Sequence, residues 1–136
     1  MTATDRDELA CPTLEDMAPL GDTYAQFEDQ TINVFGGIPG EKVLARIVRY
    51  KSRRQQRVSG IVVDVLTPSP HRVEPPCPYF GPCTGCQWQH IEYSHQLELK
   101  REAIETQLRR FPTLEDISVS PTIGCEERFN YRNHAR

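Results

Sequence analysis

Three cysteines lie close together near the middle of the chain, and this cluster constrains the fold more than any other feature. The segment reads Cys77-Pro-Tyr-Phe-Gly-Pro-Cys83-Thr-Gly-Cys86, with two prolines and two glycines between the thiols. That density of proline and glycine excludes a regular helix or strand. The spacing therefore predicts a tight cysteine knuckle over residues 76–92 that holds a metal ion or a metal cluster.

The chemistry of the knuckle leaves several interpretations open. Convergent thiolates repel one another unless a cation neutralises them, which favours a metal. Zinc would take His90 as its fourth ligand, because its spacing from Cys86 is permitted. A [4Fe-4S] cluster would need another cysteine, either Cys125 or one outside this sequence. A redox dithiol of Cys83 and Cys86 would leave Cys77 without a role and lacks the expected βαβ context.

The overall composition sets the class of protein. The chain has 136 residues, five cysteines and a formal net charge of −3. An odd number of cysteines and an acidic N-terminal region without an apolar leader argue against secretion and a disulfide framework. No apolar run approaches the roughly 18 residues that span a bilayer. We therefore expect a cytoplasmic, monomeric protein without a membrane partner.

The sequence before the knuckle predicts a small β domain. Residues 1–10 are polar and acidic, and we expect them to be disordered. Residues 11–75 alternate short β-rich runs with turn signals, and Val43, Ala45 and Ile47 alternate along one face of such a run. About five short strands suggest a small closed OB-like barrel, since closure removes exposed edges. Gly60 is expected to mark a bulge or a bend.

A different pattern follows the knuckle. Apolar residues recur every three or four positions, which predicts an amphipathic helix from Ser94 to about Arg110. The segments Ile117–Ile123 and Phe129–Arg136 are predicted to be strands. Residues 93–136 are thus interpreted as a helix and the first strands of an incomplete central domain. The predicted fold class is α+β, mainly β, and the strand pattern at the last residue suggests a piece of a longer protein.

A basic stripe runs through residues 42–57, which contain no acid although the chain as a whole is acidic. Its cations interleave with apolar residues and Tyr50, a pattern typical of a surface that binds a polyanion. A solvated edge strand protected by charge is the alternative. The candidate RNA-binding residues are those of the stripe and one arginine of a second acid-free segment, namely Arg46, Arg49, Lys51, Arg53, Arg54, Arg57 and Arg132.

Three stretches of the sequence resemble a known family. Residues Gly37–Val43, Ser69–His90 and Tyr131–Arg136 resemble the N-terminal part of bacterial RNA uracil-5-methyltransferases that carry a TRAM domain and an iron–sulfur cluster, most closely the 23S ribosomal RNA type. The middle stretch matches almost from end to end. The resemblance implies that residues 11–75 form a TRAM barrel that binds ribosomal or transfer RNA. It also implies a [4Fe-4S] cluster with three of its ligands here, Cys77, Cys83 and Cys86.

The same resemblance places the catalytic machinery elsewhere. In the family, the fourth cluster ligand, the S-adenosylmethionine fold, the catalytic cysteine and the general base lie C-terminal to the segment that matches residue 136, so Cys125 does not match the fourth ligand. The full enzyme would add a thiolate to uracil C6 and methylate C5, after the base has left its stack. This chain would then bind RNA without catalysing the reaction. A stand-alone TRAM and zinc-knuckle RNA-binding protein remains the alternative.

Overall fold

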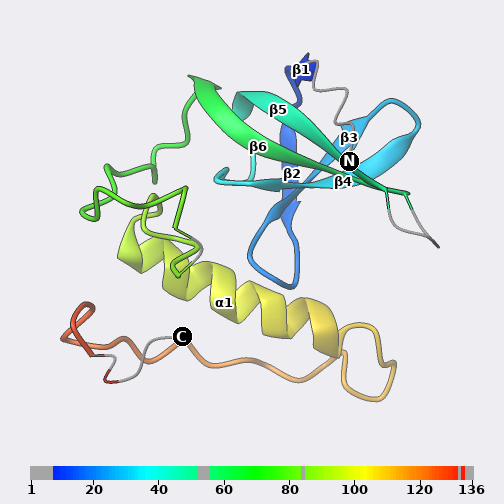
Figure 1. Cartoon of the computed structure of the whole chain (residues 1–136). Helices are drawn as coiled ribbons and strands as arrows, with labels where there is room; N and C mark the ends of the chain where they lie inside the picture. The colour runs from blue at the N-terminus through cyan, green and yellow to red at the C-terminus, as the bar shows by residue number, and fades with distance from the viewer. Residues whose placement is uncertain (1–7, 52–55, 84, 132, 134–136) are drawn as a thin grey trace. The chain divides into compact units, whose positions relative to one another are not determined.

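The computed structural model describes residues 8–51, 56–83, 85–131 and 133. It divides into two compact units, Met1–Glu92 and Tyr93–Arg136. The first unit is built on a six-stranded sheet and the second on one helix (Figure 1). The predicted mainly β, α+β class is therefore confirmed.

The sheet of the first unit has the strand order β1-β5-β6-β4-β3-β2. Neighbouring strands are antiparallel except for β4 and β6, which run parallel. The two longest strands, β5 and β6, form a hairpin at the centre of this arrangement. The strands are β1 (Glu8–Ala10), β2 (Leu14–Met17), β3 (Thr23–Phe27), β4 (Gln30–Phe35), β5 (Lys42–Lys51) and β6 (Gln56–Thr67).

One continuous segment closes the sheet into a barrel-like domain. Residues Glu8–Ala10 pair with β5, and Thr13 forms a further bridge to Lys42 at the start of that strand. From Leu14 onward the same segment pairs with β3 on the other side. The segment thus joins the two ends of the sheet and removes exposed edges, as the sequence predicted. The predicted disorder of residues 1–10 is wrong for Glu8–Ala10, and residues 1–7 lie outside the described part.

The core of the barrel follows the predicted alternation along β5. Val43, Ala45 and Ile47 are buried and pack with four buried side chains from β2, β3 and β4, namely Leu14, Ala25, Ile32 and Val34. This inward face supplies the apolar burial that stabilises the unit.

The prediction of a bulge at Gly60 is wrong. Gly60 pairs in register with Val34 and Ile47, and the register shifts fall nearer the start of β5. A Cβ at Gly60 would lie 3.1 Å from a methyl group of Val34, so the glycine allows close packing inside the barrel.

The second unit contains the predicted helix and no strand among its described residues. Helix α1 (Tyr93–Leu108) lies close to the expected bounds. The segments predicted as strands, residues 117–123 and 129–136, are irregular wherever they are described, so that prediction is wrong there. Instead, side-chain bonds hold the segment to the helix: the Thr122 hydroxyl donates to the Leu97 carbonyl, and the Tyr93 hydroxyl accepts from the Cys125 N–H. No helix among the described residues is long and apolar enough to cross a membrane.

Candidate nucleic-acid interface and cysteine knuckle

The outward face of β5 and β6 presents arginines beside an aromatic side chain. Arg46 alternates with the buried Ala45 and Ile47 and is exposed. Tyr50, 57% exposed, lies opposite Arg57 in the antiparallel register of the two strands. Side chains paired in this way lie about 5 Å apart at Cβ. The two strands therefore offer guanidinium groups and a phenol ring together, which suits phosphate contacts and base stacking.

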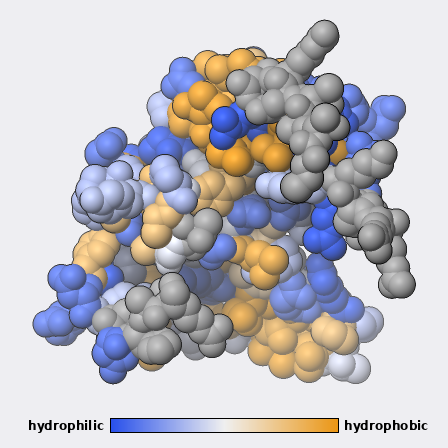
Figure 2. All heavy atoms as spheres, in the orientation of Figure 1, coloured by the Kyte–Doolittle hydropathy of each residue, from blue (hydrophilic) through white to orange (hydrophobic). Residues whose placement is uncertain are grey.

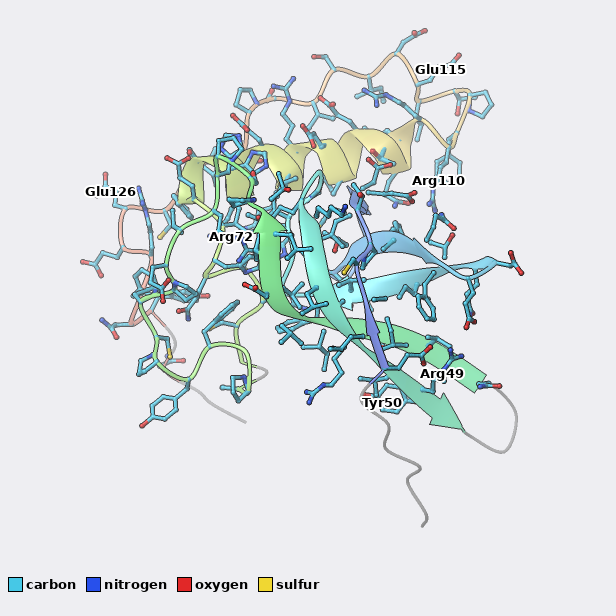
Figure 3. The ribbon with its side chains drawn as sticks, turned by 90° about the horizontal axis from the view of Figure 1, so that it is seen from above. Arg49, Tyr50, Arg72, Arg110, Glu115 and Glu126 are labelled. Atoms are coloured by element: carbon cyan, nitrogen blue, oxygen red, sulfur yellow. The ribbon has the colours of Figure 1, made fainter. Side chains whose placement is uncertain are left out.

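Arg49 was predicted to contact RNA, but the structure gives it a different environment. Its guanidinium donates to both carboxylate oxygens of Glu8, at 3.0 and 3.1 Å, and to Glu28 at 3.1 Å. The same group lies over the Phe27 ring, 5.6 Å from its centroid. The hydrogen bond from Arg49 lowers the pKa of Glu8, and the bonds to Glu8 and Glu28 raise the pKa of Arg49. Arg49, labelled in Figure 3, therefore holds β1 and the β3–β4 turn together.

The other candidate arginines and lysine are only partly described. Arg46 and Arg57 are exposed and form no ion pair with a described residue. Arg53, Arg54 and Arg132 lie outside the described residues, as does the side chain of Lys51. Within the described chain, Arg46 and Arg57 are the members of the predicted set whose charge is not neutralised by a carboxylate.

The cysteine knuckle is an irregular loop wherever it is described, as predicted. The Phe80 N–H donates to the Cys77 carbonyl and the Cys83 N–H to the Tyr79 carbonyl, which turns the chain twice within a few residues. Gly81 supplies a positive φ of 101° at this turn, a conformation that other residues rarely adopt. Cys77 is half-buried, Cys83 and Cys86 are exposed, and all three are free thiols. The loop therefore carries three accessible soft ligands on one stretch of chain.

The thiols of the knuckle do not converge on a single point in this structure. Among the described residues, no three cysteine, histidine, aspartate or glutamate side chains lie close enough together to hold one ion. Thiol chemistry suits an iron–sulfur cluster or zinc, but the loop would have to draw its sulfurs together to bind either. The metal site at Cys77, Cys83 and Cys86 therefore stays a prediction.

The knuckle closes at a narrow neck of backbone hydrogen bonds. The Val73 N–H donates to the His90 carbonyl at 3.0 Å, and the Glu92 N–H donates to the His71 carbonyl at 2.8 Å. Between these bonds, Arg72 forms an antiparallel bridge with Ile91, whose side chain is buried. The two ends of the loop are thus held side by side, and the cysteines lie in the part of the loop beyond the neck.

Four consecutive residues, Gln87–His90, form a docking segment in which each side chain makes one hydrogen bond to backbone. The Gln87 amide donates to the Leu20 carbonyl at 2.7 Å, and the Trp88 indole N–H donates to the Gly21 carbonyl at 2.8 Å. Both carbonyls belong to the turn between β2 and β3. These two bonds fasten the knuckle to the barrel. Nothing in the sequence marks the bond of Trp88 to Gly21.

Of the other two residues of the docking segment, Gln89 bonds the knuckle and His90 bonds the barrel. The side-chain oxygen of Gln89 accepts from the Cys77 N–H at 3.2 Å. The ring of His90 is buried, lies 5.4 Å from the Phe80 ring, and has its Nε2 3.1 Å from the Gly37 carbonyl oxygen. A carbonyl can only accept, so Nε2 carries the proton and Nδ1 is an acceptor. The bond to Gly37 leaves Nδ1 as the nitrogen that could bind a metal, so the alternative role of His90 as a zinc ligand stays a prediction.

Burial also fixes the charge state of His90. Desolvation lowers its pKa and outweighs the hydrogen bond to Gly37, which acts in the opposite direction. The ring is therefore neutral at pH 7. Its Nδ1 is buried and has no hydrogen-bond partner among the described residues.

A buried ion pair fixes the other end of the knuckle. Arg72 donates through Nε and Nη2 to the two oxygens of Glu41, each at 2.6 Å, and through Nη2 to the Gly36 carbonyl at 2.9 Å. Glu41 is fully buried and also accepts from the N–H groups of Ile38 and Ser69. Burial alone would raise its pKa, but the hydrogen bonds from Arg72, Ser69 and Ile38 outweigh it and lower the pKa.

Sequence reasoning did not identify this pair, although Glu41 and Arg72 both fall in stretches that carry the family resemblance. A buried carboxylate requires a cationic partner. Glu41 and Arg72 are separated by 30 residues, so the sequence does not show that Arg72 is this partner. Figure 3 shows Arg72 near one end of β5 and Arg49 and Tyr50 near the other.

Several known proteins are similar in sequence to this chain. No family model matches the chain. An uncharacterized RNA methyltransferase of Halalkalibacterium halodurans is 33% identical over 132 residues, 97% of this chain and 28% of the relative. An uncharacterized RNA methyltransferase of Nostoc sp. is 34% identical over 94% of this chain and 27% of the relative. One of Gloeobacter violaceus is 36% identical over 86% of this chain and 25% of the relative.

The chain is similar to RNA methyltransferases. It spans about a quarter of the length of the relatives it matches. The similarity agrees with the broad part of the resemblance seen in the sequence, the RNA methyltransferase class. The relatives' names specify neither the methylated base nor a cluster.

Proposed function

We propose that this chain is the RNA-binding and iron–sulfur portion of an S-adenosylmethionine-dependent RNA (uracil-5-)-methyltransferase acting on ribosomal or transfer RNA. The observation that carries the proposal is similarity to RNA methyltransferases over nearly the whole chain. Methyl transfer belongs to the part of the protein that the chain does not include, and no residue described above is assigned to catalysis.

The RNA contacts are assigned to the outward face of β5 and β6. Arg46 and Arg57 carry exposed guanidinium groups that no described carboxylate neutralises, and the exposed Tyr50 lies opposite Arg57. Arginine binds phosphate bidentately and stacks on bases, and an exposed tyrosine offers a further stacking surface. A barrel face with this composition suits single-stranded or looped RNA.

The test of this assignment compares two sets of arginine variants. In the Arg46→Gln/Arg57→Gln double variant, two phosphate contacts are lost, so the slope of log affinity against log salt should flatten by roughly 1.4 for single-stranded RNA. The control is Arg49→Gln, which removes one positive charge from β5, the strand of Arg46, but from a guanidinium already held by Glu8 and Glu28. Fluorescence anisotropy with a labelled RNA at several salt concentrations measures both. An unchanged slope in the double variant would remove this face from the RNA-binding surface.

The cluster is assigned to Cys77, Cys83 and Cys86. The donor set supports it, since three accessible free thiols lie on one loop whose ends are fixed at the neck. A fourth ligand would come from elsewhere in the whole protein. A bound cluster would cross-link the loop through iron–thiolate bonds. The protein's own contribution is the fixed neck and the bond from the Cys77 N–H to Gln89, which hold the first ligand in place.

Metal analysis of single cysteine variants tests the cluster. After anaerobic reconstitution with iron and sulfide, the chain should retain iron and acid-labile sulfide, and serine at position 77, 83 or 86 should lower both. Cys11→Ser is the control, because Cys11 is equally exposed but lies outside the knuckle. Stoichiometric zinc without sulfide would favour the zinc-knuckle alternative, and equal iron content in all variants would contradict a site in the knuckle.

A further inference from the structure

A pocket lies between the barrel and the knuckle within the first unit. Its volume is about 310 Å³, at the lower end of the range of small-molecule sites. Strand β6 forms one side, and the chain around the knuckle forms the other. The residues that define its character are Phe35, Val63, Asp64, Arg72, Phe80 and His90. In the space-filling view, apolar side chains gather over the part of the sheet where β5 and β6 lie in Figure 1 (Figure 2).

The walls of the pocket are aromatic and apolar. The Phe80 ring lies 6.4 Å from the Phe35 ring and 5.4 Å from the His90 ring, so three flat side chains line one region. Val63 is 57% exposed although it is apolar. A pocket with such walls suits a planar ligand, because ring faces stack favourably on other rings.

The polar groups of the pocket are mainly hydrogen-bond acceptors. Asp64 contributes a carboxylate, and the buried His90 Nδ1 is an acceptor that lacks a partner among the described residues. The guanidinium of Arg72 is already engaged by Glu41 and the Gly36 carbonyl. Because His90 Nδ1 is buried, the acceptor of the pocket that a ligand N–H can reach is the Asp64 carboxylate. The pocket therefore suits a ligand with N–H donors, and the Asp64 carboxylate disfavours a phosphate.

We propose that this pocket binds one unstacked base of the RNA, with its ring against Phe80 and its N–H edge toward the Asp64 carboxylate. The inference rests on the proposed function, because that function supplies RNA as the ligand. It goes beyond it by assigning a base-binding site apart from the outward arginines. Recognition at this site selects RNA whose bases are free of pairing, since a base inside a duplex cannot enter a pocket.

Two glutamate variants on one strand test the pocket. Val63→Glu places a carboxylate at a residue that lines the pocket, and Leu66→Glu places one on the same strand at an exposed apolar residue outside the lining. Both add the same charge to the RNA-binding protein, so their difference isolates the pocket. Val63→Glu should weaken binding of a short single-stranded RNA about tenfold more than Leu66→Glu does, the value of one stacked base. Equal affinities for the two variants would overturn the proposal.

A second measurement separates this site from the proposed function. Nuclear magnetic resonance of the 136-residue chain with each nucleoside 5′-monophosphate should shift the Phe80 and His90 ring resonances, and Val63→Glu should abolish the shifts. If the chain binds no RNA but shows these shifts, the pocket stands and the proposed function fails. If RNA binds through Arg46 and Arg57 but the ring resonances stay unchanged, the proposed function stands and the pocket is refuted. If the chain binds no RNA and the ring resonances stay unchanged, both the proposed function and the pocket are overturned.

Discussion

Replacing Arg72 with methionine should destabilise the first unit strongly, because it leaves the buried carboxylate of Glu41 without its cation. Glu41 has no exposed surface and accepts four hydrogen bonds, two of them from Arg72. Removing one partner of a buried ion pair typically costs about 3–5 kcal/mol. The N–H groups of Ile38 and Ser69 remain bonded to the carboxylate in the variant, so we expect about 3 kcal/mol, a large part of the ~5–15 kcal/mol stability of a small domain.

The free energy of unfolding lost in Arg72→Met should become smaller as the pH falls. In the native chain the pKa of Glu41 is lowered, so its contribution to stability is complete above the unfolded pKa of about 4.5 and is lost as pH falls through the folded pKa. Without Arg72, we expect burial to outweigh the two remaining N–H bonds and to raise the pKa of Glu41. The variant then loses stability as pH rises above the unfolded pKa, so the difference from the native chain should shrink between pH 7 and about pH 4.5.

Urea unfolding followed by the fluorescence of Trp88, the single tryptophan, measures this difference in the first unit. The matched control is the Glu41→Gln/Arg72→Met double variant, which removes the charge together with its partner and should recover part of the lost stability at pH 7. Arg72→Lys keeps a cation but loses the two-bond geometry, so its cost should be intermediate. A loss below about 1 kcal/mol at pH 7, or a difference that grows on acidification, would refute the reasoning.

Two further substitutions test the packing and docking of the first unit. Gly37→Ala should cost about 1–3 kcal/mol, because a Cβ there would lie 2.0 Å from Cδ1 of the buried Leu14; thermal unfolding measures it, and an unchanged midpoint would show that Leu14 can move aside. Trp88→Phe should cost about 1 kcal/mol by removing the bond to the Gly21 carbonyl. It should also speed amide exchange in the knuckle, and unchanged exchange would mean that this bond does not dock the knuckle.

The sequence predicts those features of the fold that arise from local patterns. The alternation of Val43, Ala45 and Ile47 identifies a strand face because side chains of a strand point to opposite sides in turn, and all three are buried. The spacing of apolar residues locates α1 to within two residues at each end. Prolines and glycines between the thiols place the irregular knuckle correctly, since neither residue suits regular structure.

Features that depend on distant partners could not be predicted. Arg46 and Arg49 look alike in the sequence, yet the carboxylates of Glu8 and Glu28 come close to Arg49 alone. The pattern at residues 117–123 has strand character, but a strand forms only where another strand pairs with it, and none does so in the described part of the chain. In each case the deciding group lies far away in the sequence.

Because of where its anchors lie, we expect that metal binding at the knuckle would leave the buried core of the barrel unchanged. Arg72 before the cysteines bonds the Gly36 carbonyl, and His90 after them bonds the adjacent Gly37 carbonyl. Both ends of the knuckle are therefore fixed to neighbouring residues of the same barrel loop, and the neck joins the ends to each other. Movement that gathers the thiols can then be confined to the part beyond the neck, which contributes no side chain to the buried core cluster. Apart from the bonds of Gln87 and Trp88 to the turn between β2 and β3, ligand binding at the knuckle and stability of the barrel should consequently depend on different sets of contacts.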